Sequence, residues 1–136
     1  MIRETTTLVI PGCPKSVNRG GAGARQHWAN AHREKMMWQD RYTMELASAG
    51  VRKHMQFLTV KVTVRWKYKH RRDSTNYFAP IFKPLLDALV GGGYIRDDTD
   101  EWVKVEPLEF EIARHWDYRD PRIAAEMVIQ LEGRYL

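Results

Sequence analysis

Residues 57–69 constrain the fold more than any other segment, because apolar and polar side chains alternate along all of it. A period of two is typical of a β-strand that buries one face and exposes the other. Four of the polar positions are Lys or Arg, so we expect an apolar core face and a basic second face. The apolar set is Leu58, Val60, Val62, Val64, Trp66 and Tyr68, and the polar set is Thr59, Lys61, Thr63, Arg65, Lys67 and Lys69.

Two helices are expected. Residues 25–49 have apolar side chains at helical spacing, followed by Gly50 as a C-terminal stop. A second helix is expected from residue 79 or 80 to 89, because Pro80 and Pro84 are tolerated in or near a first helical turn. The stripe of the first helix that we expect to pack in the core consists of Trp28, Ala31, Trp38, Tyr42 and Leu46, interrupted by Lys35.

The remaining strands flank these helices. Residues 5–10 are β-branched and apolar, and residues 123–131 alternate. Residues 102–113 form another strand, with a bulge at Pro107 where the apolar phase changes. Two prolines and four glycines make residues 11–24 a loop. The order β-α-β-α-β-β predicts a single α/β (α+β) domain over all 136 residues, with a mixed β-sheet and two main helices packed on it.

Composition excludes several classes of protein. With 43% hydrophobic and 29% charged residues, the chain is ordinary for a folded domain, and no apolar run approaches the ~18 residues of a membrane span. The N-terminus lacks the features of a signal peptide. The single cysteine, Cys13, excludes an intramolecular disulfide and a multi-cysteine zinc site, and the five histidines show no zinc-binding spacing. We therefore expect a cytoplasmic protein whose single thiol is buried or idle and is not a nucleophile.

The distribution of charge suggests a polyanionic partner. Residues 1–72 carry 15 Lys or Arg and 4 Asp or Glu, a balance of +11, whereas residues 73–136 carry 7 and 13, a balance of −6. Eight cations and no acid lie between Glu45 and Asp73. A run of cations without interleaved acids favours nucleic acid, and a solvated charged face is the plain alternative.

Acidic residues gather at both ends of the second expected helix. Asp73 precedes it, and Asp97, Asp98, Asp100 and Glu101 follow it. Taken singly, the first is explained by a turn or helix-cap role and the others by a solvated turn. Together they flank the helix of a strand–helix–strand unit, and we expect such a unit to bring its two ends together at one edge of the sheet. Carboxylates that converge there would suit Mg²⁺ or Mn²⁺.

Two further groups carry candidate chemistry. Lys83 and Asp87 lie four residues apart and share a face of the expected helix. They form either a surface ion pair or a functional pair in which Lys83 projects into the acidic cluster. The second group lies in the glycine-rich loop and the start of the first helix, where glycines permit close approach to phosphate. It comprises Lys15, Asn18, Arg19, Arg25 and His27.

Taken together, these residues resemble the RusA-type Holliday junction resolvases of bacteria and prophages. The family pattern is R-D-x-D-N, a helix with Lys and Asp four residues apart and an A-L ending, a glycine turn, and D-D before a strand. The resemblance is densest over residues 72–103, and the opening PGCPKSVNR is similar to the family's P-P-S-x-N-R-like loop. The matching residues are Arg72-Asp73-Ser74-Thr75-Asn76, Lys83, Asp87-Ala88-Leu89, Gly93 and Asp97-Asp98.

Two positions depart from the family pattern. Thr75 occupies the place of the second aspartate, so one carboxylate is missing. The stretch from Asn76 to Lys83 is about four residues longer than in the best-known members, which is close to one helical turn and would keep Lys83 and Asp87 facing as before. A proline in this stretch, here Pro80, is typical of the phage-borne branch of the family.

The resemblance implies a homodimeric endodeoxyribonuclease that uses Mg²⁺, or Mn²⁺ in its place, and resolves four-way DNA junctions by paired symmetric nicks in recombination and repair. It implies no organic cofactor and no membrane, and it places the protein, phage- or prophage-encoded, in the cytoplasm of a bacterial host. The implied metal ligands are Asp73 and Asp98, with Asp97 as a third ligand or a supporting residue, and Lys83 and Asp87 complete the catalytic set. The implied DNA-binding residues are Lys15, Asn18, Arg19, Arg25, Lys67, Lys69, Arg71, Arg72 and Asn76.

Two other functions remain open. Thr75 in place of an aspartate is consistent with a junction-binding module that has lost catalysis. The affinity of such a module for a junction would fall steeply as the salt concentration rises, and no metal-dependent cleavage product would form. In a protein-binding or RNA-binding α/β domain, the acids would be a solvated turn and Mn²⁺ would not bind.

Overall fold

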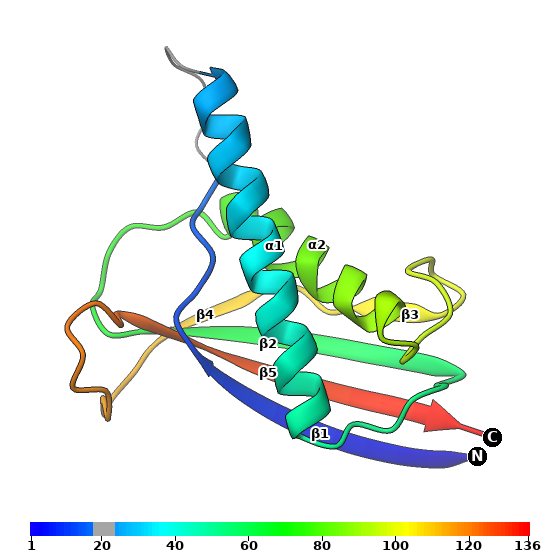
Figure 1. Ribbon diagram of the computed structural model, residues 1–136. Helices are drawn as coiled ribbons and strands as arrows, with labels where there is room; N and C mark the ends of the chain where they lie inside the picture. Colours follow the sequence, from blue (N-terminus) through cyan, green and yellow to red (C-terminus); the bar gives the residue numbers. More distant parts are fainter. Residues whose placement is uncertain (18–23) are drawn as a thin grey trace.

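The computed structural model describes residues 1–17 and 24–136, with backbone alone for residues 24–27. Within these residues, five strands form one mixed sheet and two helices pack on one of its faces (Figure 1). The predicted fold class is therefore confirmed. In chain order the elements are β1 (Ile2–Pro11), α1 (Ala24–Ser48), β2 (Phe57–Trp66), α2 (Thr75–Gly91), β3 (Val103–Val105), β4 (Glu109–Ile112) and β5 (Ala125–Tyr135).

Strand β2 is paired along both edges. Along one edge it is antiparallel to β5, which is in turn antiparallel to β1. Along the other edge it is parallel first to β3 and then to β4. The single strand predicted over residues 102–113 is thus two short strands. The break surrounds Pro107, which has no N–H to donate to a ladder, whereas Glu106 still donates its N–H to the carbonyl of Val60 at 2.8 Å.

The alternation in β2 has the predicted phase, and its even-numbered residues from Leu58 to Trp66 are buried. The strand ends at Trp66, three residues earlier than predicted. Tyr68 was expected in the core and is instead 54% exposed, because it lies in the loop beyond the ladder.

Helix α1 packs on the sheet through its C-terminal half. Trp38, Tyr42 and Leu46 are buried as predicted, but Trp28 is 72% exposed and Ala31 is exposed. The prediction that the whole stripe is buried is wrong because the N-terminal half of α1 projects past the sheet (Figure 1). In the described part of the chain, no helix is both long enough and apolar enough to cross a membrane.

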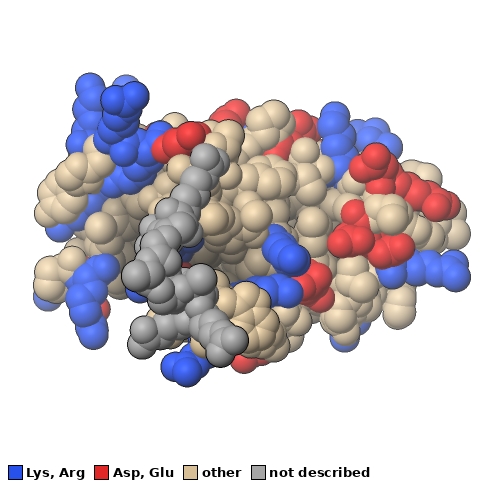
Figure 2. All heavy atoms as spheres, turned by 90° about the horizontal axis from the view of Figure 1, so that it is seen from above, with Lys and Arg blue, Asp and Glu red and all other residues tan. Residues whose placement is uncertain are grey.

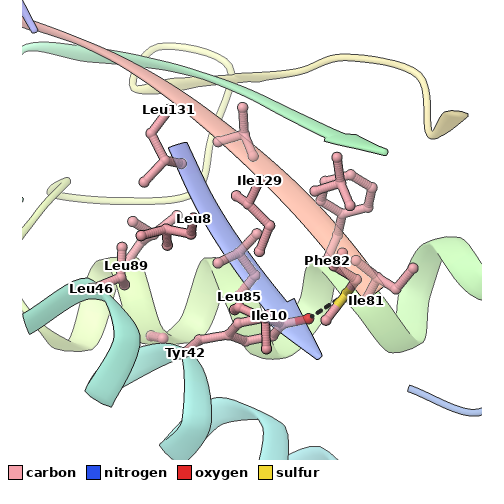
Figure 3. Close-up of a cluster of buried hydrophobic side chains, with 14 of the residues drawn as sticks. Leu8, Ile10, Tyr42, Leu46, Ile81, Phe82, Leu85, Leu89, Ile129 and Leu131 are labelled. Atoms are coloured by element: carbon pink, nitrogen blue, oxygen red, sulfur yellow. Dashed lines mark hydrogen bonds between the residues drawn. The ribbon is translucent and has the colours of Figure 1, made fainter. Parts of the chain in front are cut away.

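The core lies between the two helices and the sheet (Figure 3). Helix α2 begins at Thr75, earlier than predicted, and its apolar face meets side chains from β1, β5 and α1. The hydroxyl of Tyr42 donates a hydrogen bond to the sulfur of Met127 at 3.5 Å in this core. The side chains in view are Leu8 and Ile10 of β1, Tyr42 and Leu46 of α1, Ile81, Phe82, Leu85 and Leu89 of α2, and Ile129 and Leu131 of β5.

Candidate metal and nucleic-acid site

Asp73 lies in the turn that leads into α2 and is exposed. Its Oδ1 atom accepts hydrogen bonds from the backbone N–H of Thr75 at 3.0 Å and from the Thr75 hydroxyl at 2.7 Å. This is the turn role that a lone aspartate is expected to have before a helix. Thr75, where the sequence departs from the R-D-x-D-N pattern, therefore orients Asp73 and adds no carboxylate of its own.

Arg72 holds the loop that presents Asp73. Its guanidinium carbon lies 3.8 Å from the ring centroid of the buried Trp66. The same guanidinium donates to the backbone carbonyls of Tyr68 at 3.1 Å and His70 at 3.4 Å. Arg72 was predicted as a DNA-binding residue. Its contacts also hold residues 67–72 against the end of β2.

The loop before α1 meets the start of α2. The N–H of Val17 donates to the carbonyl of Asn76 at 2.9 Å, and the N–H of Lys15 donates to Glu34 Oε1 at 2.8 Å. Lys15, Lys69 and Arg71 are exposed, and Lys67 is half-buried. Of the other predicted DNA-binding residues, Asn18 and Arg19 lie outside the described residues, and Arg25 is described only by its backbone in the first turn of α1.

The acidic loop lies at the opposite end of α2 (Figure 1). Asp97, Asp98, Asp100 and Glu101 are all exposed, and Asp97 Oδ1 accepts the N–H of Asp98 at 2.8 Å. Helix α2 has 17 residues and is about 25 Å long, with Asp73 before its first turn and this loop beyond its last. The prediction that one protomer brings the two acidic groups together is therefore wrong.

The reason is the topology of the strand–helix–strand unit. Strands β2 and β3 are parallel, with Leu58 beside Val103. In such a unit the chain enters the helix from the end of the first strand and leaves it toward the start of the second, so the two loops lie at opposite ends of the sheet. Within the residues that the structure describes, no three Asp, Glu, His or Cys side chains are grouped so that they could hold a metal ion.

Lys83 lies midway along α2 and is exposed. It is eight residues beyond Thr75, about 12 Å along the helix axis, so it adjoins neither acidic group of its own protomer. Among the described side chains, the ion-pair partner of Asp87 is Lys35 of α1, at 2.9 Å. This contact ties α1 to α2 and differs from the Lys83–Asp87 surface pair that the spacing suggested.

The outer face of β2 is neutralised by acids from other strands. Lys61 Nζ lies 3.5 Å from Glu109, and Arg65 is paired with Glu111 at 2.9 Å and with the buried Glu126. The expectation of a basic strand face is therefore wrong for its first half. The cations that remain for a polyanion are those beyond Trp66, at the Asp73 end of the molecule.

Charge on the helix-covered side is divided between two ends (Figure 2). Blue side chains gather at the end where residues 67–72 leave β2, whereas at the end where the acidic loop follows α2 a red group lies between further blue side chains. The end at residues 67–72 is therefore the more uniformly basic of the two.

Three residues that the sequence did not single out, His54, Gln56 and Trp102, line a pocket next to the acidic loop. They come from separate segments and carry no shared spacing, so a single sequence offers no signal that would group them.

Cys13 is predicted to be slow to alkylate. Burial raises the pKa of its thiol to about 12, with Glu34 adding to the rise and Arg72 opposing it. A raised pKa keeps the thiol protonated at neutral pH, and the thiolate is the reactive form. At pH 8 we expect iodoacetamide to label the folded protein at least about a hundredfold more slowly than the urea-unfolded chain. Equal labelling rates in the two states, measured by mass spectrometry, would contradict the raised pKa of this partly buried thiol.

No family model matches this chain, and no curated protein matches it either.

Proposed function

We propose that this protein is a Mg²⁺-dependent endonuclease that acts as a homodimer on four-way DNA junctions in the bacterial cytoplasm. The observation that supports it most is the position of Asp73, an exposed carboxylate among the cations of two loops. Cations in such a place bind phosphates, and an exposed carboxylate beside them is a suitable oxygen ligand for a divalent metal ion close to a bound phosphate. The resemblance to the RusA-type resolvases supports the same function.

The second half of the metal site has to come from another protomer, because α2 separates the two acidic groups of one chain. In a two-fold dimer whose α2 helices run antiparallel across the axis, the start of each helix faces the end of the other. Asp73 of one protomer then meets Asp98 of the partner subunit. The exposed cations beside Asp73 and the exposed carboxylates of the acidic loop favour this pairing. Two equivalent sites result, as paired nicks in a two-fold junction require.

Exposed carboxylate oxygens from the two ends fit a hard divalent ion such as Mg²⁺. When bound, such an ion supplies polarisation of the scissile phosphate and a lowered pKa for the attacking water. Asp73 and Asp98 are its proposed ligands, and Asp97 orients the backbone of Asp98 through their hydrogen bond. Lys83, midway along α2, would lie near the two-fold axis, about 12 Å along the helix from either site, where its ammonium group can hold a DNA phosphate between the two sites.

The test is incubation of the purified protein with a synthetic four-way junction and with a linear duplex of the same sequence. In Mg²⁺ we expect paired symmetric nicks in the junction only, and in EDTA we expect binding without product. A protein that leaves the junction intact over a range of Mg²⁺ and Mn²⁺ concentrations would count heavily against an endonuclease.

A second candidate is a junction-binding module without catalysis. It is favoured by Thr75, whose hydroxyl donates to Asp73 at the place where the family has a further carboxylate. This alternative predicts salt-dependent junction binding with no product in either metal. Restoring the carboxylate with Thr75→Asp would then create cleavage that the natural chain lacks.

A further inference from the structure

A pocket of about 410 Å³ lies beside the acidic loop, at the end of α2 away from Asp73. Residues 54–56 form one side, residues of the α2 C-terminal turn and the following loop form another, and Trp102 completes it. Its volume is within the ~300–1,000 Å³ range of small-molecule sites. The proposed catalytic residues are not part of its lining, so it requires a separate explanation.

The lining has the chemistry of a nucleobase site. Trp102 offers an indole ring, and the guanidinium carbon of Arg96 lies 5.9 Å from its centroid. Indole rings and guanidinium groups are the planar surfaces on which unpaired bases stack. His54 and Gln56 add groups that can both donate and accept hydrogen bonds at a base edge.

The wall that carries these polar groups is fixed by the backbone. His54 adopts a left-handed conformation with φ of 62°, which is uncommon for a residue other than glycine. Its N–H donates to the carbonyl of Gly93 at 3.0 Å, and the N–H of Met55 donates to that of Tyr94 at 2.8 Å. The side chain of Lys53 lies over the Tyr94 ring at 5.6 Å, so a further cation flanks the site. The pocket is therefore preformed, with cations near it for the adjoining phosphates.

We propose that this pocket binds an unpaired nucleobase of the branched DNA, stacked on Trp102, next to the strand that is cut. The proposal rests on the proposed function. Because the pocket adjoins the Asp97–Asp98 loop, a base held in it would fix the neighbouring phosphate in register with the metal ligands. It would also distinguish a junction, whose bases at the branch point unstack easily, from a continuous duplex.

The experiment measures binding in EDTA, so that the metal site plays no part. The variants are Trp102→Ala, Trp102→Phe and Gln56→Ala, with Trp28→Ala as the control because Trp28 is exposed and outside the pocket. The probes are a four-way junction with 2-aminopurine at the branch point and a linear duplex. Circular dichroism and urea unfolding establish that each variant is folded.

We expect Trp102→Ala to weaken junction binding about tenfold and to abolish the 2-aminopurine fluorescence change, with duplex binding unchanged. Gln56→Ala should weaken it severalfold, and Trp102→Phe should stay within about threefold of wild type because a phenyl ring still stacks. Trp28→Ala should bind as wild type does.

Three outcomes would overturn the base site. If the wild type prefers the junction and the folded Trp102→Ala and Gln56→Ala variants retain that preference, the base site is wrong and the nuclease proposal stands. If the wild type binds junction and duplex equally, both proposals fail. If free adenosine monophosphate saturates the pocket of the wild type but not of Trp102→Ala, while junction binding is the same in both, the ligand is a free nucleotide and not a DNA base.

Discussion

We expect a mixture of the Asp73→Asn and Asp98→Asn proteins to nick a four-way junction that neither protein nicks alone. Each variant lacks one carboxylate of the proposed metal site, so each alone should be slower than wild type by more than about a hundredfold. In a dimer of one protomer of each kind, one site combines the two asparagines and the other combines the two aspartates. The second site is intact, and activity returns.

The size and the form of the rescue are both diagnostic. Random exchange makes about half of the dimers mixed, and each mixed dimer has one intact site of two, so nicking should return to about a quarter of the wild-type level. A dimer with one active site cuts one strand, so the product should be a nicked junction and not two resolved duplexes. Gel assays under native and denaturing conditions distinguish these products.

The matched control is Asp100→Asn, which removes the same charge from the same exposed loop without touching a proposed ligand. It should retain nicking within a fewfold. The two inactive variants should bind the junction as tightly as wild type or more tightly, because a negative charge that faces phosphate is gone. Exchange of subunits without any rescue would show that the two aspartates do not meet across a dimer axis.

Replacing Trp66, a core residue at the end of β2, should have a large effect on stability. Trp66 is buried at the end of β2, with the Tyr77 and Phe110 rings each 5.4 Å away and the Arg72 guanidinium carbon 3.8 Å from its ring centroid. Trp66→Ala leaves a cavity among these groups, and we expect the free energy of unfolding to fall by about 3–5 kcal/mol. Urea denaturation followed by circular dichroism measures the loss.

A second variant separates packing from hydrogen bonding. The indole Nε1 of Trp66 is buried without a hydrogen-bond partner among the described residues, so Trp66→Phe removes no hydrogen bond. We expect it to cost only about 1–2 kcal/mol, because part of the ring contact remains. Trp28→Ala, at a 72% exposed position, should change stability by less than about 0.5 kcal/mol. If Trp66→Ala lowered the free energy of unfolding as little as Trp28→Ala does, the contacts of Trp66 with Tyr77, Phe110 and Arg72 would not stabilise the fold.

The Trp66 ring also supports the loop that carries the candidate site. Arg72 stacks on Trp66 and bonds the carbonyls of Tyr68 and His70, so the loop before Asp73 depends on this ring. Trypsin cleaves after the Lys and Arg residues of this loop. Because Trp66→Phe weakens the contact with Arg72, we expect trypsin to cleave residues 67–72 faster under native conditions. The placement of Asp73 is thus a consequence of packing at the end of β2.

Local patterns were sufficient to predict most of the elements. The period of two in β2 and the helical spacing in α1 and α2 each depend on neighbouring residues alone, and all three elements have the predicted type. The errors lie where a distant segment decides the outcome. Trp28 has the spacing of a core residue, but it is exposed because the N-terminal half of α1 projects past the sheet (Figure 1). The sequence pattern suggested that the cations in the first half of β2 have no acidic partners. Their partners Glu109, Glu111 and Glu126 are more than forty residues away along the chain, so no local pattern includes them.

The sequence by itself determined the α+β class, the apolar face of β2 and the candidate residues, because side-chain periodicity and residue chemistry are local properties. Only the tertiary structure decided where those residues lie relative to one another. The parallel pairing of β2 with β3 places Asp73 and Asp98 at opposite ends of α2. Carboxylates at the two ends of a helix about 25 Å long cannot bind the same metal ion, so the proposed metal site needs residues from two protomers.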